Sequence, residues 1–147
     1  MYTILLPTDG SDFSNKTMKQ AMSFAGALSA KVIGLHVVPQ FHMPRNEEDL
    51  LPPSAALKER VDEEHNVKAQ AVLAPVEAAA RDAGLEYECV VAINDRVYEE
   101  IVNTAANRNC DLIVIASHGH AGTTASLLGS ETARVLTHTG LPVLVLH

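Results

Sequence analysis

The sequence predicts one α/β domain over residues 1–147, a three-layer, doubly wound, Rossmann-like fold with a five-stranded parallel sheet of order 3-2-1-4-5. Two observations lead to this fold class. Five short apolar segments, rich in β-branched residues, have the length of strands buried on both faces. The segments between them carry apolar residues at helical spacing, so that strands and helices alternate along the chain. This alternation requires right-handed crossovers and a parallel sheet covered on both faces.

The first strand is expected over residues 3–6 and ends before Pro7, which cannot donate to a sheet ladder. Gly10 then permits a sharp turn. The helix that follows has three candidate N-cap residues, Ser11, Asp12 and Ser14. A second buried strand is expected over residues 32–38.

Residues 39–56 are interpreted as a long surface loop, because they contain four prolines, a charged run and no clean periodicity. Loops of this length are usually mobile or functional. A long helix is expected from about residue 57 to residue 82, and Pro75 inside it should kink or interrupt it. The residues predicted to share the inward face of this helix are Val61, Lys68, Val72, Val76 and Ala79.

The second half of the chain repeats the alternation of strand and helix. Strands are expected over residues 86–92, 112–116 and 142–146. The helices between them are expected over residues 96–107 and 131–137. Each of the predicted crossovers is therefore helical, as a parallel sheet requires.

The composition excludes several classes of protein. A net charge of −7 and the lack of a basic stripe argue against a nucleic-acid partner. No apolar run approaches the roughly 20 residues of a membrane span, and no basic segment precedes the first apolar stretch, so we expect a cytoplasmic protein. Cys89 and Cys110 are interpreted as reduced core residues, and His36 as a hydrogen-bonded core residue.

In a doubly wound sheet, ligands bind beyond the carboxyl ends of the strands, where the strand order reverses. For the order 3-2-1-4-5, this point lies between the first and fourth strands. Residues 7–11 follow the first strand, and residues 117–130, rich in small side chains, follow the fourth. A strand, a glycine loop and a helix start present backbone N–H groups and a positive helix end to an anion. The anion that we expect is the phosphate chain of a nucleotide.

Five segments resemble the universal stress protein family, in the right order and over nearly the whole chain: Leu6-Pro7-Thr8-Asp9-Gly10-Ser11, Leu35-His36-Val37, Ala116-Ser117-His118-Gly119, Leu127-Leu128-Gly129-Ser130 and Leu141-Pro142-Val143-Leu144-Val145. The ATP-binding branch of that family carries Gly-x2-Gly-x9-Gly-Ser/Thr. The corresponding residues here are Ala116, Gly119, Gly129 and Ser130. Ala116 departs from the pattern, and its methyl group would be damaging only if φ at this position were positive.

The resemblance implies ATP as the ligand, with Mg²⁺ as a partner of its phosphates. Gly119 would let the loop backbone approach the phosphates. Gly129 and Ser130 would bring N–H groups and a hydroxyl to the β- and γ-phosphates, and Glu131 would add only its backbone N–H. Asp9 would accept from the ribose or the adenine, or help to hold the metal. The other residues of the implied site are Pro7, Thr8 and Val37, which would wall the adenine, and Ala116, Ser117, His118, His120 and Gly122.

Plainer interpretations of these residues stay open. Asp9 can be a helix N-cap, and Gly119 and Gly122 can be ordinary turn glycines. His118 and His120 have no third Cys, His or carboxylate nearby in the sequence. We therefore expect these histidines to be exposed to solvent, or His118 to lie beside the phosphates, rather than the pair to form a transition-metal site.

Catalysis has little support, because the chain lacks a P-loop lysine, a Gly-x-Ser-x-Gly elbow and carboxylates at catalytic spacing. The resemblance implies instead a nucleotide-dependent stress-response protein, whose nucleotide state alters the surface offered to an unknown regulatory protein partner, with residues 39–56 as a candidate changing surface. One rival is an interaction module of the same fold that binds no nucleotide, which Ala116 favours. The other is an enzyme, either a slow ATP hydrolase or a flavin-type α/β protein.

The last strand is an edge in the predicted order, and its residues Val143, Leu144 and Val145 are apolar. An exposed apolar edge favours pairing with another chain. A two-fold contact through this strand would close the edge and give a symmetric dimer. The resemblance also implies a homodimer of this kind.

Overall fold

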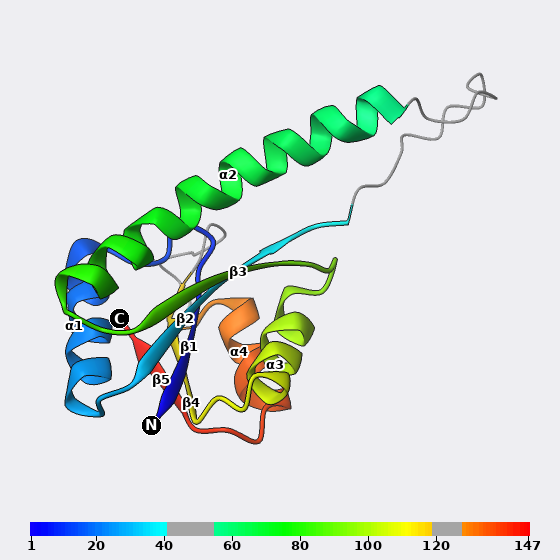
Figure 1. Cartoon of the computed structure of the whole chain (residues 1–147). Helices are drawn as coiled ribbons and strands as arrows, with labels where there is room; N and C mark the ends of the chain where they lie inside the picture. The colour runs from blue at the N-terminus through cyan, green and yellow to red at the C-terminus, as the bar shows by residue number, and fades with distance from the viewer. Residues whose placement is uncertain (41–54, 119–127) are drawn as a thin grey trace.

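The computed structural model describes residues 1–40, 55–118 and 128–147, and it places a five-stranded, all-parallel sheet at the centre (Figure 1). The strand order is β3-β2-β1-β4-β5, which confirms the predicted fold class and order. The strands are β1 (Thr3–Pro7), β2 (Lys31–Val38), β3 (Tyr87–Ile93), β4 (Leu112–Ala116) and β5 (Val143–Leu146). The helices are α1 (Asn15–Ala27), α2 (Ala55–Asp82), α3 (Val97–Asn107) and α4 (Ser130–His138).

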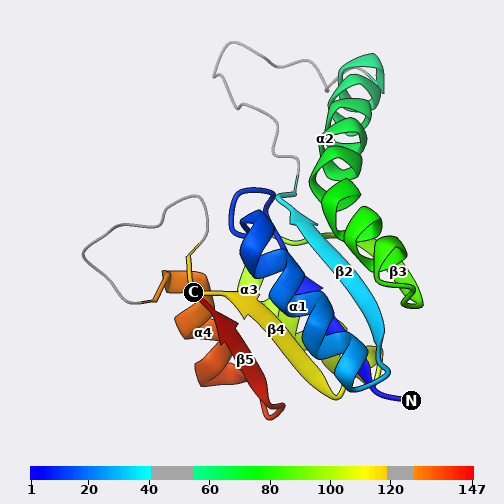
Figure 2. The ribbon, with the colours of Figure 1, turned by 90° about the vertical axis from the view of Figure 1, so that its left-hand side faces the viewer.

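Helices α1 and α2 cover one face of the sheet, and α3 and α4 cover the other (Figures 1 and 2). Each face has its own apolar cluster, and successive side chains of the central strand β1 point alternately into the two clusters. Ile4 and Leu6 belong to the cluster beneath α1 and α2, whereas Leu5 belongs to the cluster beneath α3 and α4. Because β1 is buried on both faces, its sequence is a continuous apolar run.

Ser14 is the N-cap of α1, and it is one of the three caps considered from the sequence. Its hydroxyl oxygen accepts a hydrogen bond from the backbone N–H of Thr17 at 3.2 Å. This contact satisfies one of the N–H groups that a helix start leaves without an intrahelical partner. The α1 end of the loop between β1 and α1 is therefore anchored.

Helix α2 differs from its prediction in three respects. It begins at Ala55, inside the expected loop, and it runs without interruption through Pro75. Pro75 lies on the exposed side of the helix, where water can satisfy the carbonyl that the proline leaves unbonded. Lys68 is exposed and not inward-facing; the buried residues of this helix are Ala69, Leu73, Val76 and Ala80.

Gly34 in β2 explains how closely α2 approaches the sheet. A Cβ atom at this position would lie 3.1 Å from Cγ1 of Val76 and 3.5 Å from Cδ2 of Leu73. Both neighbours are buried, and Val76 belongs to the apolar cluster beneath α1 and α2. Because Gly34 has no side chain, α2 can pack closely against β2 at this position.

Strand β3 is an edge strand and is less buried than the sequence predicted. Cys89 is exposed, so its prediction as a core residue is wrong, whereas Cys110 is buried as expected. Val91 and Ile93 are also exposed, at 45% and 66%. Cys89, Val91 and Ile93 alternate along β3, so they share the one face of this strand that is left accessible.

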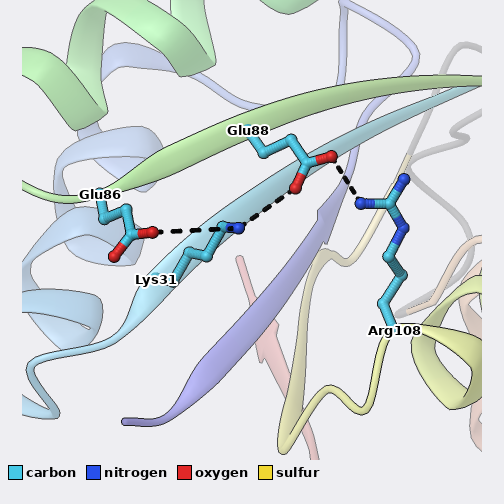
Figure 3. Close-up of polar contacts among 4 residues, drawn as sticks. All are labelled: Lys31, Glu86, Glu88 and Arg108. Atoms are coloured by element: carbon cyan, nitrogen blue, oxygen red, sulfur yellow. Dashed lines mark hydrogen bonds and ion pairs between the residues drawn. The ribbon is translucent and has the colours of Figure 1, made fainter.

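Charged side chains join β2, β3 and the end of α3 on the outer part of the sheet (Figure 3). The ammonium group of Lys31 lies 3.2 Å from the carboxylate of Glu88 and 4.0 Å from that of Glu86. The guanidinium of Arg108 lies 2.5 Å from the second carboxylate oxygen of Glu88. Hydrogen bonds from Arg108 and Lys31 lower the pKa of the Glu88 carboxyl.

Glu88→Gln is expected to lower the free energy of unfolding at pH 7 by no more than about 1 kcal/mol, because all four side chains are partly exposed. The ionised carboxylate stabilises the folded chain above its ordinary pKa of 4.5, and this contribution is lost as the pH falls through the lowered folded value. Denaturant unfolding of both proteins at pH 7 and pH 3 measures the difference. Glu86→Gln is the control. A difference in the free energy of unfolding between the wild type and Glu88→Gln that is larger at pH 3 than at pH 7 would contradict the assignment.

Within residues 1–40, 55–118 and 128–147, none of the helices combines the length and the apolar character needed to cross a membrane.

Candidate functional site

A cavity of about 250 Å³ opens at the carboxyl ends of the central strands, between β1 and β4, where the strand order reverses. This is the position at which doubly wound sheets bind ligands. The described residues that line it come from β1 and its exit loop, the end of β2, the start of α3, the end of β4 and the start of α4: Pro7, Thr8, Asp9, Asp12, Leu35, His36, Val37, Val97, Ile101, Ile115, Ala116, Gly129, Ser130, Glu131 and Thr132.

Thr8 organises the β1 side of the cavity. Its backbone N–H continues the ladder to the carbonyl of Leu35 at 2.9 Å, and its hydroxyl donates to the carboxylate of Asp12 at 2.5 Å. The same hydroxyl oxygen accepts from the N–H of Gly10 at 3.1 Å. Gly10 has φ of +96°, a conformation that glycine adopts without strain. These contacts fix the turn that carries Asp9 to the cavity.

Asp9 and Asp12 bring two carboxylates to this turn. Asp9 accepts from both the N–H and the hydroxyl of Ser11 at 3.0 Å, and its own N–H donates to Asp12 at 3.2 Å. Because Ser14 caps α1, the alternative that Asp9 is the N-cap is wrong. Burial raises the pKa of the Asp12 carboxyl; the hydrogen bond from Thr8 opposes this rise, and the charge of Asp9 adds to it.

His36 lies behind the same turn. Its Nδ1 is 3.0 Å from the backbone carbonyl of Thr8, and the side chain is buried. The prediction of a hydrogen-bonded core histidine is therefore confirmed. The structure adds that this residue also lines the cavity, where its neighbour Val37 lies as predicted.

Ala116 ends β4 on the opposite side of the cavity, and its backbone is compatible with alanine. The non-glycine residues with positive φ in the described chain are Ser29 and Asn109. Ala116 thus has no strain of the kind that would require glycine. Its carbonyl accepts from the buried hydroxyl of Thr132 at 2.8 Å, which fastens the start of α4 to the end of β4.

Ser117 is buried next to the cavity and is not among the residues that line it. Its N–H donates to the carbonyl of Leu146 at 2.8 Å, and its carbonyl accepts from the N–H of Gly129 at 2.5 Å. His118 has its Nδ1 3.1 Å from the Ser117 hydroxyl and does not line the cavity either. The other predicted loop residues, Gly119, His120 and Gly122, lie outside the described residues.

Helix α4 points its first turn at the cavity. Gly129 is its N-cap, with φ of −67° and ψ of 156°, and makes no side-chain cap. The first N–H groups of a helix have no intrahelical partner, and the helix dipole makes this end positive. Gly129, Ser130 and Glu131, which the sequence places at the expected nucleotide site, line the cavity. This arrangement suits an anionic ligand.

Glu131 does more than the sequence indicated. Its carboxylate accepts from the backbone N–H of Tyr98, in the first turn of α3, at 3.0 Å. The other carboxylate oxygen pairs with Arg134 at 3.1 Å. Arg96, the N-cap of α3, makes no side-chain cap. Glu131 therefore caps α3 from the neighbouring helix, across 33 positions of sequence.

Several lining residues were missed by sequence reasoning: Asp12, Leu35, His36, Val97, Ile101, Ile115 and Thr132. Two of these had a usable signal. Leu35 precedes the predicted Val37 by two positions, so both point to the same face of β2. Ile115 immediately precedes the predicted Ala116 at the end of β4. The residues from α3 had none, because their place depends on how α3 packs against α4.

Solved structures share this fold over the whole chain. The structure of MJ0577 is 27% identical, covers 99% of this chain and 94% of that one, and has a TM-score of 0.73. A universal stress protein in complex with cAMP is 23% identical, with coverages of 99% and 96% and a TM-score of 0.69. The universal stress protein from Archaeoglobus fulgidus in complex with dAMP is 16% identical, with coverages of 100% and 98% and a TM-score of 0.68. An Arabidopsis thaliana family protein with AMP bound is 14% identical, with coverages of 99% and 91% and a TM-score of 0.63.

Curated sequences agree with the structures. Universal stress protein MJ0531 of Methanocaldococcus jannaschii is 31% identical over 97% of this chain and 79% of its own length. Universal stress protein MJ0577 of the same organism is 29% identical over 97% of this chain and 92% of its own. A sequence model of the universal stress protein family matches residues 1–147. The chain therefore belongs to the universal stress protein family.

Proposed function

We propose that this chain binds ATP in the cavity between β1 and β4 and acts as a nucleotide-dependent regulator in the stress response. The observation that carries the proposal is the cavity at the reversal of strand order, with the first turn of α4 directed into it. Family members solved with cAMP, dAMP and AMP support an adenine nucleotide as the ligand. Ala116 is no obstacle, because its backbone does not need glycine.

Asp9 is the residue that would hold Mg²⁺ together with the phosphates. It lines the cavity, and a carboxylate is a ligand that Mg²⁺ accepts beside phosphate oxygens. Among the described residues, no three His, Cys, Asp or Glu side chains form a group that could hold a metal. The nucleotide would therefore supply most of the ligands. When bound, the ion would neutralise part of the phosphate charge.

Titration calorimetry of the full chain with ATP and Mg²⁺ tests the proposal, with GTP as the comparison nucleotide. We expect saturable heat with ATP at sub-millimolar concentration and weaker binding of GTP. Mass spectrometry of the small molecules released on denaturation identifies any ligand that is carried through purification. Absence of ATP binding by a protein that unfolds cooperatively would overturn the proposal.

We propose a binding role without catalysis, in which nucleotide occupancy changes the surface offered to a protein partner. The lining residues support binding by backbone N–H groups and one or two carboxylates. Phosphoryl transfer needs in addition strong neutralisation of charge and a positioned base or water. Phosphate release that exceeds the background of a Gly129→Arg variant would show an ATPase instead.

We also propose a homodimer through the outer edge of β5. The carbonyl of Pro142 accepts from the N–H of Ile113 in β4 at 3.0 Å, and the carbonyl of Leu146 accepts from the N–H of Ser117, just after β4, at 2.8 Å. Because backbone groups alternate in direction along a strand, those of Val143 and Val145 point away from β4. These outward groups are available to a second copy of the chain.

Val145→Pro is expected to convert the dimer to a monomer while the fold persists. Proline removes an outward N–H and leaves the hydrogen bonds between β4 and β5 in place. Size-exclusion chromatography with light scattering measures the mass, and a thermal melt checks folding. Val145→Ala keeps the N–H and should stay dimeric. A dimer that survives in the proline variant would place the interface elsewhere.

A further inference from the structure

We propose that the carboxylate of Glu131 controls how many phosphates the cavity accepts, by weakening binding more with each phosphate charge added. The inference rests on the proposed binding of adenine nucleotides and goes beyond it. It assigns to the Glu131 side chain a role opposite to that of its backbone. The N–H of Glu131 belongs to the helix start that attracts phosphate, whereas its carboxylate repels it.

Two contacts hold this carboxylate in the wall of the cavity. One oxygen accepts from the N–H of Tyr98 at 3.0 Å, and the other pairs with Arg134 at 3.1 Å. Val97, which precedes Tyr98, lines the same cavity. If the side chain turned away, the first turn of α3 would lose its cap, because Arg96 supplies none. The carboxylate is therefore anchored, and it cannot retreat from an incoming anion without a cost.

The surroundings of Glu131 offer little compensation for a highly charged ligand. Three of the described lining residues are acidic, Asp9, Asp12 and Glu131, and none of the described lining residues is lysine or arginine. Arg134 offsets part of the Glu131 charge through their ion pair, and its side chain is 57% exposed. Phosphates thus meet N–H dipoles and a net negative wall.

AMP, ADP and ATP carry increasing negative charge. A phosphate bound at the start of α4 would lie closer to Glu131, which lines the same cavity, than the Debye length of about 8 Å. Each added phosphate should therefore feel this carboxylate, whereas adenosine should not. Glu131→Gln removes the charge and keeps a carbonyl oxygen that can accept from Tyr98. We expect this variant to lower the ratio of the ATP and AMP dissociation constants about three- to ten-fold and to leave the adenosine affinity unchanged.

The experiment measures the dissociation constants of adenosine, AMP, ADP and ATP by calorimetry in EDTA, and again with excess Mg²⁺. Glu99→Gln is the matched control: it removes the same charge one residue beyond Tyr98, from a side chain that does not line the cavity. The ratio should not move in this control. Mg²⁺ should shrink the effect of Glu131→Gln, because it neutralises the phosphates.

Arg134→Gln gives a second and opposite measurement, because it leaves the Glu131 charge unpaired. The ratio of the ATP and AMP dissociation constants should rise, and this result decides the question if Glu131→Gln does not fold. An unchanged ratio of the ATP and AMP dissociation constants would overturn the inference. So would an equal change in the dissociation constants of all four ligands, adenosine included. Either result would show that Glu131 acts only as a structural cap of α3. If the wild-type chain binds none of the four ligands, the proposed function itself fails, and that outcome is separately visible.

Discussion

Leu5→Ala is expected to lower the free energy of unfolding by about 2–5 kcal/mol, the largest loss of stability that we predict. Leu5 is 0% exposed in the central strand β1, beneath α3 and α4. Its neighbours include Ile33, Leu35 and Ile113, which are themselves buried in strands and cannot easily collapse into the space. The change therefore removes the transfer free energy of the side chain and leaves a cavity.

Denaturant unfolding monitored by circular dichroism measures this loss. The matched control is Leu136→Ala, which deletes the same atoms from a side chain in α4 that is 40% exposed. Substitution at such a surface position should change the free energy of unfolding by about 0.5 kcal/mol or less. Equal losses for the two variants would show that Leu5 is not in the core.

Val37→Trp is expected to weaken the binding of adenine nucleotides by roughly 5- to 150-fold, which corresponds to an overpacking cost of about 1–3 kcal/mol. Val37 lines the cavity at the end of β2, next to the buried His36. An indole at this position would occupy space within a cavity of only about 250 Å³. The nucleotide and the new ring would compete for the same volume.

Calorimetric titration with ATP compares the variant with Val91→Trp. Val91 lies in the edge strand β3, is 45% exposed and does not line the cavity, so the same substitution there should leave binding unchanged. Thermal melts of both variants show whether each is folded. A Val37→Trp protein that is folded and binds ATP as tightly as the wild type would place the ligand elsewhere.

The sequence was sufficient for the fold because the core strands are unambiguous. Residues 3–6 and 112–116 are short, continuous apolar runs, which their length and β-branched residues make typical of a strand covered on both faces. The prediction failed where burial depends on tertiary neighbours. Lys68 has the correct helical spacing and faces solvent, because the inward face of α2 is set by its contact with Gly34. Cys89 is exposed, because it shares with Val91 and Ile93 the face of β3 that is left accessible.

The candidate site shows the same division. The backbone parts at the exits of β1 and β4 could be predicted, since the topology alone brings them together. The hydrogen bonds of Asp12 to Thr8 and of Glu131 to Tyr98 could not. The first depends on the path of a turn, and the second on the packing of α3 against α4. Sequence periodicity predicts neither the path of this turn nor the packing of these two helices.

The floor of the cavity consists of Leu35, Ile101 and Ile115, which also belong to the apolar cluster beneath α3 and α4. Occupancy of the cavity and integrity of the core are therefore not independent. Any molecule that binds only the folded chain at this place raises the free energy of unfolding by mass action. Ligand-free copies open more often, and proteases cut them first when opening is fast relative to cleavage. The lifetime of the protein in the presence of proteases would then follow the supply of its ligand.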